Sequence, residues 1–196
     1  MQCEPIRGGL AVLDRARDRV FVEIFPISRG AEYPDGAPTA LWIAGEGTFT
    51  IHGDPTVMTE GINGCDRYIE TEVMGPLTEM EPGESCELRI SWRLAAIHAE
   101  EIISVNHCGA VGRRLAVDVS AITGSFGVFY EANLELVAFD RASQVAGKFA
   151  LGKVSPLRSI VLDERISLPS NAVRCSLMLS DEQENCLGVL DHVHIR

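Results

Sequence analysis

Residues 68–77 read YIETEVMGPL, an alternation of polar and apolar side chains that ends at a Gly-Pro pair. Successive side chains of a strand point to opposite faces, so Tyr68, Glu70 and Glu72 share one face, with neighbours about 7 Å apart. The stretch therefore predicts a strand that carries two carboxylates on one side. Such a face suits a sugar site, a cation site or a solvated surface.

Similar runs recur along the whole chain, separated by Gly, Pro, Asn and Asp turns, and this spacing predicts an all-β fold of antiparallel sandwiches. A looser, alanine-rich pattern at 95–103 predicts one or two helical turns. Turns are expected at 33–36, where Pro presets one dihedral angle and Gly accepts a positive φ, and also at 123–125 and 168–171. The expected strands are 9–14, 19–27, 39–44, 48–52, 67–74, 84–94, 115–122, 128–139, 144–150, 159–166, 172–180 and 186–190.

The break in the strand pattern predicts two domains. Residues 1–97 form the first β domain, 98–107 a linker and 108–196 the second domain. Six or seven strands in about 90 residues are typical of an immunoglobulin-like β-sandwich.

The bulk composition excludes several classes of protein. With 46% hydrophobic residues, the 196-residue chain can bury a core, and its formal charge of −11 argues against a nucleic-acid partner. The six cysteines contain no C-x-x-C pair, so free thiols are expected, with neither a metal nor a cofactor. The sequence shows neither a signal peptide nor an apolar run of about 18 residues, so we expect no membrane segment and a cytoplasmic location.

A resemblance to a known family covers residues 7–94, a little under half of the chain. In order, this segment contains a short strand, a Pro-Gly turn, the alternating strand with its Gly-Pro-Leu end, and a Pro-Gly-Glu-Ser turn before a tryptophan. These pieces resemble the closing segment of the galactose-mutarotase-like supersandwich, the fold of the aldose 1-epimerases. They are found at 9–12, 33–36, 68–77, 82–85 and Trp92.

The resemblance implies a carbohydrate ligand. Epimerases of that family open the sugar ring with a glutamate as base and a histidine as acid, because one group must take the anomeric proton while another protonates the ring oxygen. Glu70 or Glu72 stands where such a base could come from. The catalytic histidines of the family precede this segment, so the resemblance carries no acid over to this chain.

The expected ligand-binding residues are two carboxylates and their aromatic and histidine neighbours, namely Tyr68, Glu70, Glu72, Trp42 and His52. A plainer interpretation is that solvent, or a Lys or Arg on the next strand, neutralises the carboxylates. We expect Trp42 and Trp92 to pack in the core, as large apolar side chains usually do.

The other four histidines carry weaker signals. His192 and His194 share a strand face, where a solvent-facing pair is favoured over a metal site. His98 and His107 flank the expected linker, and loop histidines without chemistry are favoured there.

Three functional hypotheses follow. The first is a non-catalytic carbohydrate-binding or accessory protein. The second is a mutarotase-like epimerase with a composite site that uses Glu70 or Glu72 as base, with its acid supplied by a second subunit. The third is an assembly module that forms a homodimer through an exposed sheet edge.

Overall fold

The computed structural model describes residues 6–44, 47–51, 54–58, 68–118 and 121–195. They form strands, turns and loops, with a single 3-10 turn in the described part, so the all-β prediction is confirmed. None of the helical segments in this part of the chain is long and apolar enough to cross a membrane.

The chain divides into two compact units. Unit 1 comprises Met1–Leu10 and Ile24–Ser91, and unit 2 comprises Ala11–Glu23 and Trp92–Arg196. These bounds differ from the expected 1–97 and 108–196, because a segment near the N-terminus joins the C-terminal half of the chain.

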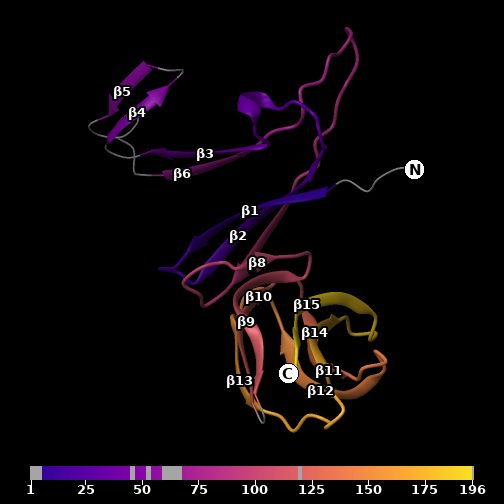
Figure 1. Ribbon diagram of the computed structural model, residues 1–196. Helices are drawn as coiled ribbons and strands as arrows, with labels where there is room; N and C mark the ends of the chain where they lie inside the picture. Colours follow the sequence, from indigo (N-terminus) through magenta and orange to yellow (C-terminus); the bar gives the residue numbers. More distant parts are fainter. Residues whose placement is uncertain (1–5, 45–46, 52–53, 59–67, 119–120, 196) are drawn as a thin grey trace. The chain divides into compact units, whose positions relative to one another are not determined.

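Unit 2 contains two four-stranded antiparallel sheets that enclose one hydrophobic core (Figure 1). Leucines from the second sheet, such as Leu136 and Leu177, meet Phe126 of the first sheet, and all three are fully buried. The first sheet has the order β13-β10-β9-β8, and the second has the order β12-β11-β14-β15. The strands are β8 (Ser104–Val105), β9 (Gly109–Asp118), β10 (Ala121–Val128), β11 (Ala132–Phe139), β12 (Val145–Val154), β13 (Ile160–Arg165), β14 (Arg174–Ser180) and β15 (Cys186–His194).

Tight hairpin turns in unit 2 are built on aspartates. Asp140 Oδ1 accepts the backbone N–H groups of Ala142 and Gln144, both at 2.9 Å, in the turn between β11 and β12. Asp181 repeats the arrangement between β14 and β15. The connection between β13 and β14 contains a turn where the sequence predicts one, at 168–171. There the N–H of Ala172 donates to the carbonyl of Pro169 at 3.0 Å.

Four expectations about elements in and before unit 2 are wrong. The strand predicted at 115–122 is not a single strand, because β9 ends at Asp118 and β10 begins at Ala121. The turn predicted at 123–125 lies inside β10, where the register with β9 shifts between Thr123 and Ser125. The segment at 95–103 is not helical: the end of β7 (Ser91–Ala96) leads into an extended connection in which the Ile97 N–H donates to the carbonyl of Asp18 at 3.0 Å. Residues 84–90 form a loop in place of the first part of the strand predicted at 84–94.

Unit 1 is built from short antiparallel pairs, in which β3 (Thr39–Ala44) pairs with β6 (Tyr68–Val73) and β4 (Gly47–Ile51) pairs with β5 (Asp54–Met58). The predicted turn at 33–36 is the 3-10 turn Pro34–Gly36, with positive φ at Asp35 and Gly36. The hydroxyl of buried Tyr33 accepts the N–H of Ser28 at 2.9 Å and anchors this turn.

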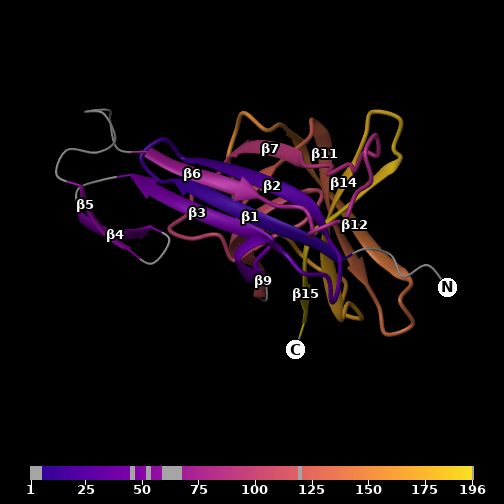
Figure 2. The same cartoon turned by 90° about the horizontal axis from the view of Figure 1, so that it is seen from above.

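One further sheet has the order β1-β2-β7 and contains β1 (Ile6–Asp14) and β2 (Arg19–Ile27) (Figure 2). The division into units crosses these strands, since Ala11–Glu23 belongs to unit 2. In β2, Val20, Val22 and Phe25 are buried, and so is the charged residue Glu23, so the burial does not follow a simple alternation along the whole strand.

Candidate functional site

The predicted carbohydrate face lies on the antiparallel pair β3–β6, whose strands run side by side (Figure 2). Trp42 is directly opposite Glu70, and Ala40 is directly opposite Glu72. Directly opposite residues project from the same face of a sheet. We call this set, Ala40, Trp42, Glu70 and Glu72, the Trp42 face.

A Lys or Arg on the next strand does not neutralise the carboxylates, since their cross-strand neighbours are Trp42 and Ala40 and neither Glu70 nor Glu72 forms an ion pair among the described residues. Solvation, the other plain interpretation, agrees with the exposure of Glu70. The expectation that Trp42 packs in the core is wrong. Trp42 is 48% exposed, so its indole is not in the core. Two strands alone have no second layer of structure packed on them that would bury a side chain of this size.

Trp92 does not pack in the core either. It is 67% exposed and meets Phe21 of β2 edge to face, with 5.9 Å between the ring centroids. Both residues belong to unit 2, so Trp92 is no part of the Trp42 face.

Of the other two predicted ligand-binding residues, the structure describes only the backbone of Tyr68. The backbone of Tyr68 pairs with Ala44, which places it next along the strand from the Glu70–Trp42 pair. The side chain of Tyr68 and the whole of His52 lie outside the described residues. The opposite side of the same strand pair exposes Leu41 and Ile69.

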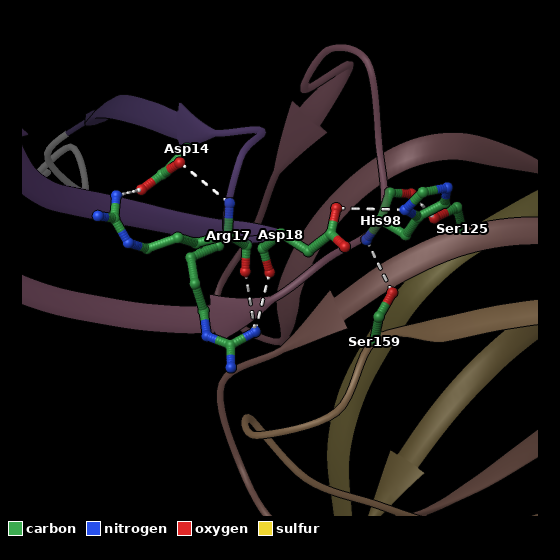
Figure 3. A network of polar contacts seen from close by, with 7 residues as sticks. Asp14, Arg17, Asp18, His98, Ser125 and Ser159 are labelled. Carbon is green, nitrogen blue, oxygen red and sulfur yellow. Dashed lines mark hydrogen bonds and ion pairs between the residues drawn. The ribbon is translucent and has the colours of Figure 1, made fainter.

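In unit 2, His98 is the centre of a polar network (Figure 3). Its Nδ1 lies 3.2 Å from Asp18 Oδ1, and its backbone N–H donates to Ser159 Oγ at 2.8 Å. The Ser125 hydroxyl donates to the carbonyl oxygen of His98. Both serines therefore contact the backbone of His98 and not its ring, so the group is not arranged as a serine nucleophile with a histidine base.

His107 and Cys108 also lie together, with 3.4 Å between Nε2 and Sγ. Burial raises the pKa of Cys108 to about 11, and the neighbouring Cys186 adds to the effect. At neutral pH the thiol is protonated, so it is a poor nucleophile and a poor metal ligand. His107 Nε2 is also 3.0 Å from the carbonyl oxygen of Leu187, which explains the position of the ring structurally.

The structure gives no support for a metal site in the part of the chain that it describes. No cluster of three or more His, Cys, Asp or Glu side chains suited to a metal occurs there. His192 and His194 are neighbours on one face of β15, with 6.2 Å between their ring centroids, and both are exposed.

Sequence reasoning missed a hollow of about 790 Å³ within unit 2. It lies where the β10–β11, β12–β13 and β14–β15 connections meet, and its lining includes Glu131, Ser159 and Asp181 from those connections. No local pattern in the sequence signals the hollow, because it depends on where connections from separate parts of the chain meet.

No family model matches the sequence, and neither a curated protein nor a solved structure matches the chain.

Proposed function

We propose that this chain is a non-catalytic carbohydrate-binding protein and that a sugar ring binds on the Trp42 face of unit 1. The observation that supports this most directly is the position of an exposed indole directly opposite Glu70. An indole offers a flat apolar surface to the C–H groups of a sugar, while ionised carboxylates accept hydrogen bonds from its hydroxyls.

The same geometry favours binding over catalysis. Ring opening requires a base and an acid on either side of the anomeric centre. The strand pairing places Trp42 and Ala40 directly opposite the two carboxylates, so neither Glu70 nor Glu72 has an acid such as a histidine as its cross-strand neighbour. The free thiols of Cys86, Cys108, Cys175 and Cys186 support a reducing, cytoplasmic location for the protein.

Tryptophan fluorescence tests the proposal, because the chain has two tryptophans and each can be removed in turn. Trp92→Phe leaves Trp42 as the only indole, and Trp42→Phe leaves Trp92. Titration with D-galactose and D-glucose should shift the emission of Trp92→Phe and leave that of Trp42→Phe unchanged. Equal responses from the two variants, or none from either with any sugar, would contradict the proposal.

Removal of one carboxylate tests the polar half of the site. Glu70→Gln should weaken sugar binding about tenfold, since hydrogen bonds to a charged group contribute about 1.5–3 kcal/mol. Glu79→Gln, an exposed carboxylate in a loop of the same unit, is the matched control and should bind as wild type does.

Polarimetry of freshly dissolved α-D-glucose separates binding from epimerase activity. A binding protein leaves the rate of mutarotation at the value for buffer. Acceleration that Glu72→Gln or Glu70→Gln abolishes would replace our proposal with the composite-site enzyme.

A specific observation also favours assembly with a second copy, through a sheet face and not through the edge first expected. Leu41 and Ile69 are exposed on the side of β3–β6 opposite the Trp42 face, and exposed apolar side chains on one face suit packing against the same face of a second copy. Light scattering should then give a dimer that Leu41→Asp converts to a monomer. A monomeric wild type would exclude the homodimer.

A further inference from the structure

The hollow in unit 2 is an opening into the hydrophobic core. Its lining includes Leu134 of β11 together with Ile160 and Leu162 of β13, and all three are buried members of that core. Since β11 and β13 belong to different sheets, the hollow lies between the core faces of the two sheets. Its volume of about 790 Å³ falls within the range of about 300–1,000 Å³ that is usual for ligand sites.

The hollow is elongated along β13. Ile160 and Glu164 both line it, and a strand advances about 13 Å over four residues. The connection 155–159, which joins β12 to β13, contributes lining residues at the Ile160 end. Glu164 therefore stands towards the other end of the space, away from this connection.

Glu164 lies on the core face of β13. Alternate residues of a strand share a face, so Ile160, Leu162 and Glu164 form one row. The antiparallel partner of Glu164 on β10 is Ile122, which is 1% exposed and belongs to the core. A carboxylate thus ends a row of apolar side chains that line the hollow.

Most of the other charges around the hollow are already engaged. The lining carries four carboxylates and two basic side chains, namely Glu131, Glu164, Asp181, Glu182, Lys153 and Arg158. Lys153 lies 3.3 Å from Glu182. Asp181 accepts the backbone N–H groups of Gln183 and Asn185 at 2.9 and 2.8 Å, so its carboxylate is committed to the turn between β14 and β15.

Glu164 is the carboxylate best placed for a ligand. It forms neither a hydrogen bond nor an ion pair with a described residue. Both basic lining residues belong to the connection end, Lys153 near the end of β12 and Arg158 in the connection itself. A complementary ligand offers a positive charge to Glu164 and apolar surface to Leu134 and Leu162.

We propose that the hollow binds a small organic cation, a primary ammonium group on an unbranched apolar chain. The ammonium group donates hydrogen bonds to the Glu164 carboxylate. The chain lies along Ile160 and Leu162 of one sheet and against Leu134 of the other. All lining residues belong to unit 2, so this site is independent of the Trp42 face.

A structural role is the alternative for Glu164. In the described part of the chain β13 is the last strand of its sheet, and an inward-pointing charge on such a strand discourages pairing with another chain. That role requires no ligand. It predicts that the charge of an added amphiphile makes no difference to its binding, so a series of probes that differ only in charge separates the two.

The probe is n-octylammonium, and the readout is isothermal titration calorimetry with the full-length protein at neutral pH. An aliphatic amine is protonated there, as the Lys side chain is. The wild type should bind n-octylammonium more tightly than neutral n-octanol, and octanoate most weakly. Each methylene removed from the ammonium probe should weaken binding about twofold to fourfold, as expected for burial of its apolar surface.

Two carboxylates of β13 provide a matched pair of variants. Glu164→Gln should weaken n-octylammonium binding about threefold to fivefold, as expected for a partly exposed ion pair, and leave n-octanol binding unchanged. Asp163→Asn should bind both probes as wild type does, because Asp163 is also exposed but lies on the other face of the strand. Equal melting temperatures of the two variants would show that the fold is intact.

Methyl NMR locates the probe. The signals of Leu134 and Leu162 should shift on titration with n-octylammonium. Those of Leu115, which is buried in the same core but does not line the hollow, should stay in place. Trp42→Phe should bind the probe as wild type does, so the result is separate from that of the sugar titration.

Four results would overturn the proposal. The first is the absence of n-octylammonium binding, and the second is equal affinity for n-octylammonium and octanoate. The third is an equal loss of binding in Glu164→Gln and Asp163→Asn. The fourth is a shift of the Leu115 signals as large as that of Leu134 and Leu162, which would mean that the probe enters the core without a defined site.

Discussion

Asp191 of β15 accepts a hydrogen bond from the guanidinium of Arg114 in β9, with 2.9 Å between Oδ1 and Nη1. Its second oxygen accepts the N–H of Leu115 at 2.8 Å. The Asp191 side chain is only 2% exposed. Since β9 and β15 belong to different sheets, this carboxylate joins the two layers of unit 2.

Asp191→Ala should lower the free energy of unfolding of unit 2 by about 2–3 kcal/mol, because it leaves the Leu115 N–H without its buried acceptor. Asp191→Asn retains one acceptor oxygen and should cost less. Denaturant unfolding measures both, with exposed Asp163→Asn as a control that changes stability by less than about 0.5 kcal/mol. An Asp191→Ala protein as stable as wild type would show that the pair contributes nothing net.

The thiols should differ widely in reactivity. Burial raises the pKa of Cys108 to about 11 and also raises the pKa of Cys175, whereas Cys86 and Cys186 are exposed. In a background in which Cys3 and Cys65 are serine, a thiol reagent should modify two cysteines quickly in the native protein and all four after denaturation. Fast labelling of Cys108, identified by peptide mapping, would contradict the burial seen here.

Two glycines with positive φ should respond differently to alanine. Gly152 and Gly188 have φ of 105° and 142°, but only at Gly188 would a Cβ overlap neighbours, at 2.3 Å from His107 Nε2 and 2.7 Å from Cys108 Sγ. Gly152→Ala should cost about 1 kcal/mol from its backbone conformation alone. Gly188→Ala should cost about 2 kcal/mol more because of the added overlap. Equal costs in thermal unfolding would show that the region around His107 relaxes freely.

The turn between β14 and β15 should weaken in acid. The hydrogen bond from the Asn185 side chain holds the pKa of Asp181 below its usual value of 3.8, and the backbone N–H groups of Asn185 and Gln183 act in the same direction. A carboxyl whose pKa is lower in the folded state stabilises the fold above its unfolded pKa, and this contribution is lost as the pH falls through the folded pKa.

Carboxyl NMR titration measures that shift directly. Asn185→Ala removes the largest cause, so the pKa of Asp181 should rise towards 3.8 in this variant. Asn171→Ala, an exposed asparagine in another turn, should leave it unchanged. A wild-type pKa at or above 3.8 would contradict the hydrogen-bonded turn.

Local chemistry made part of the fold predictable. The strands at 19–27 and 39–44 agree with β2 and β3 to the residue, and the turn at 33–36 forms where Pro34 and Gly36 require it. Each depends on alternation or turn geometry within a few residues. The prediction of a strand was wrong for residues 84–90. A strand requires hydrogen-bond partners on a neighbouring strand, and its own sequence does not specify them.

The same distinction applies to the candidate sites. Alternation alone placed Glu70 and Glu72 on one face, but only the pairing of β3 with β6 brought Trp42 opposite Glu70 and left it exposed. The hollow in unit 2 depends on three connections that meet from distant parts of the chain, and no single stretch of sequence indicates it.

The sequence by itself therefore determined the all-β class, most strand positions, the turns at 33–36 and 168–171 and the face to which the residues of a strand point. These follow from steric and hydrogen-bonding preferences of neighbouring residues. Only the tertiary structure decided the strand order, the division into units, the exposure of Trp42 and Trp92, and the hollow where three connections of unit 2 meet. Those features depend on which distant segments pair, and pairing is a property of the whole chain.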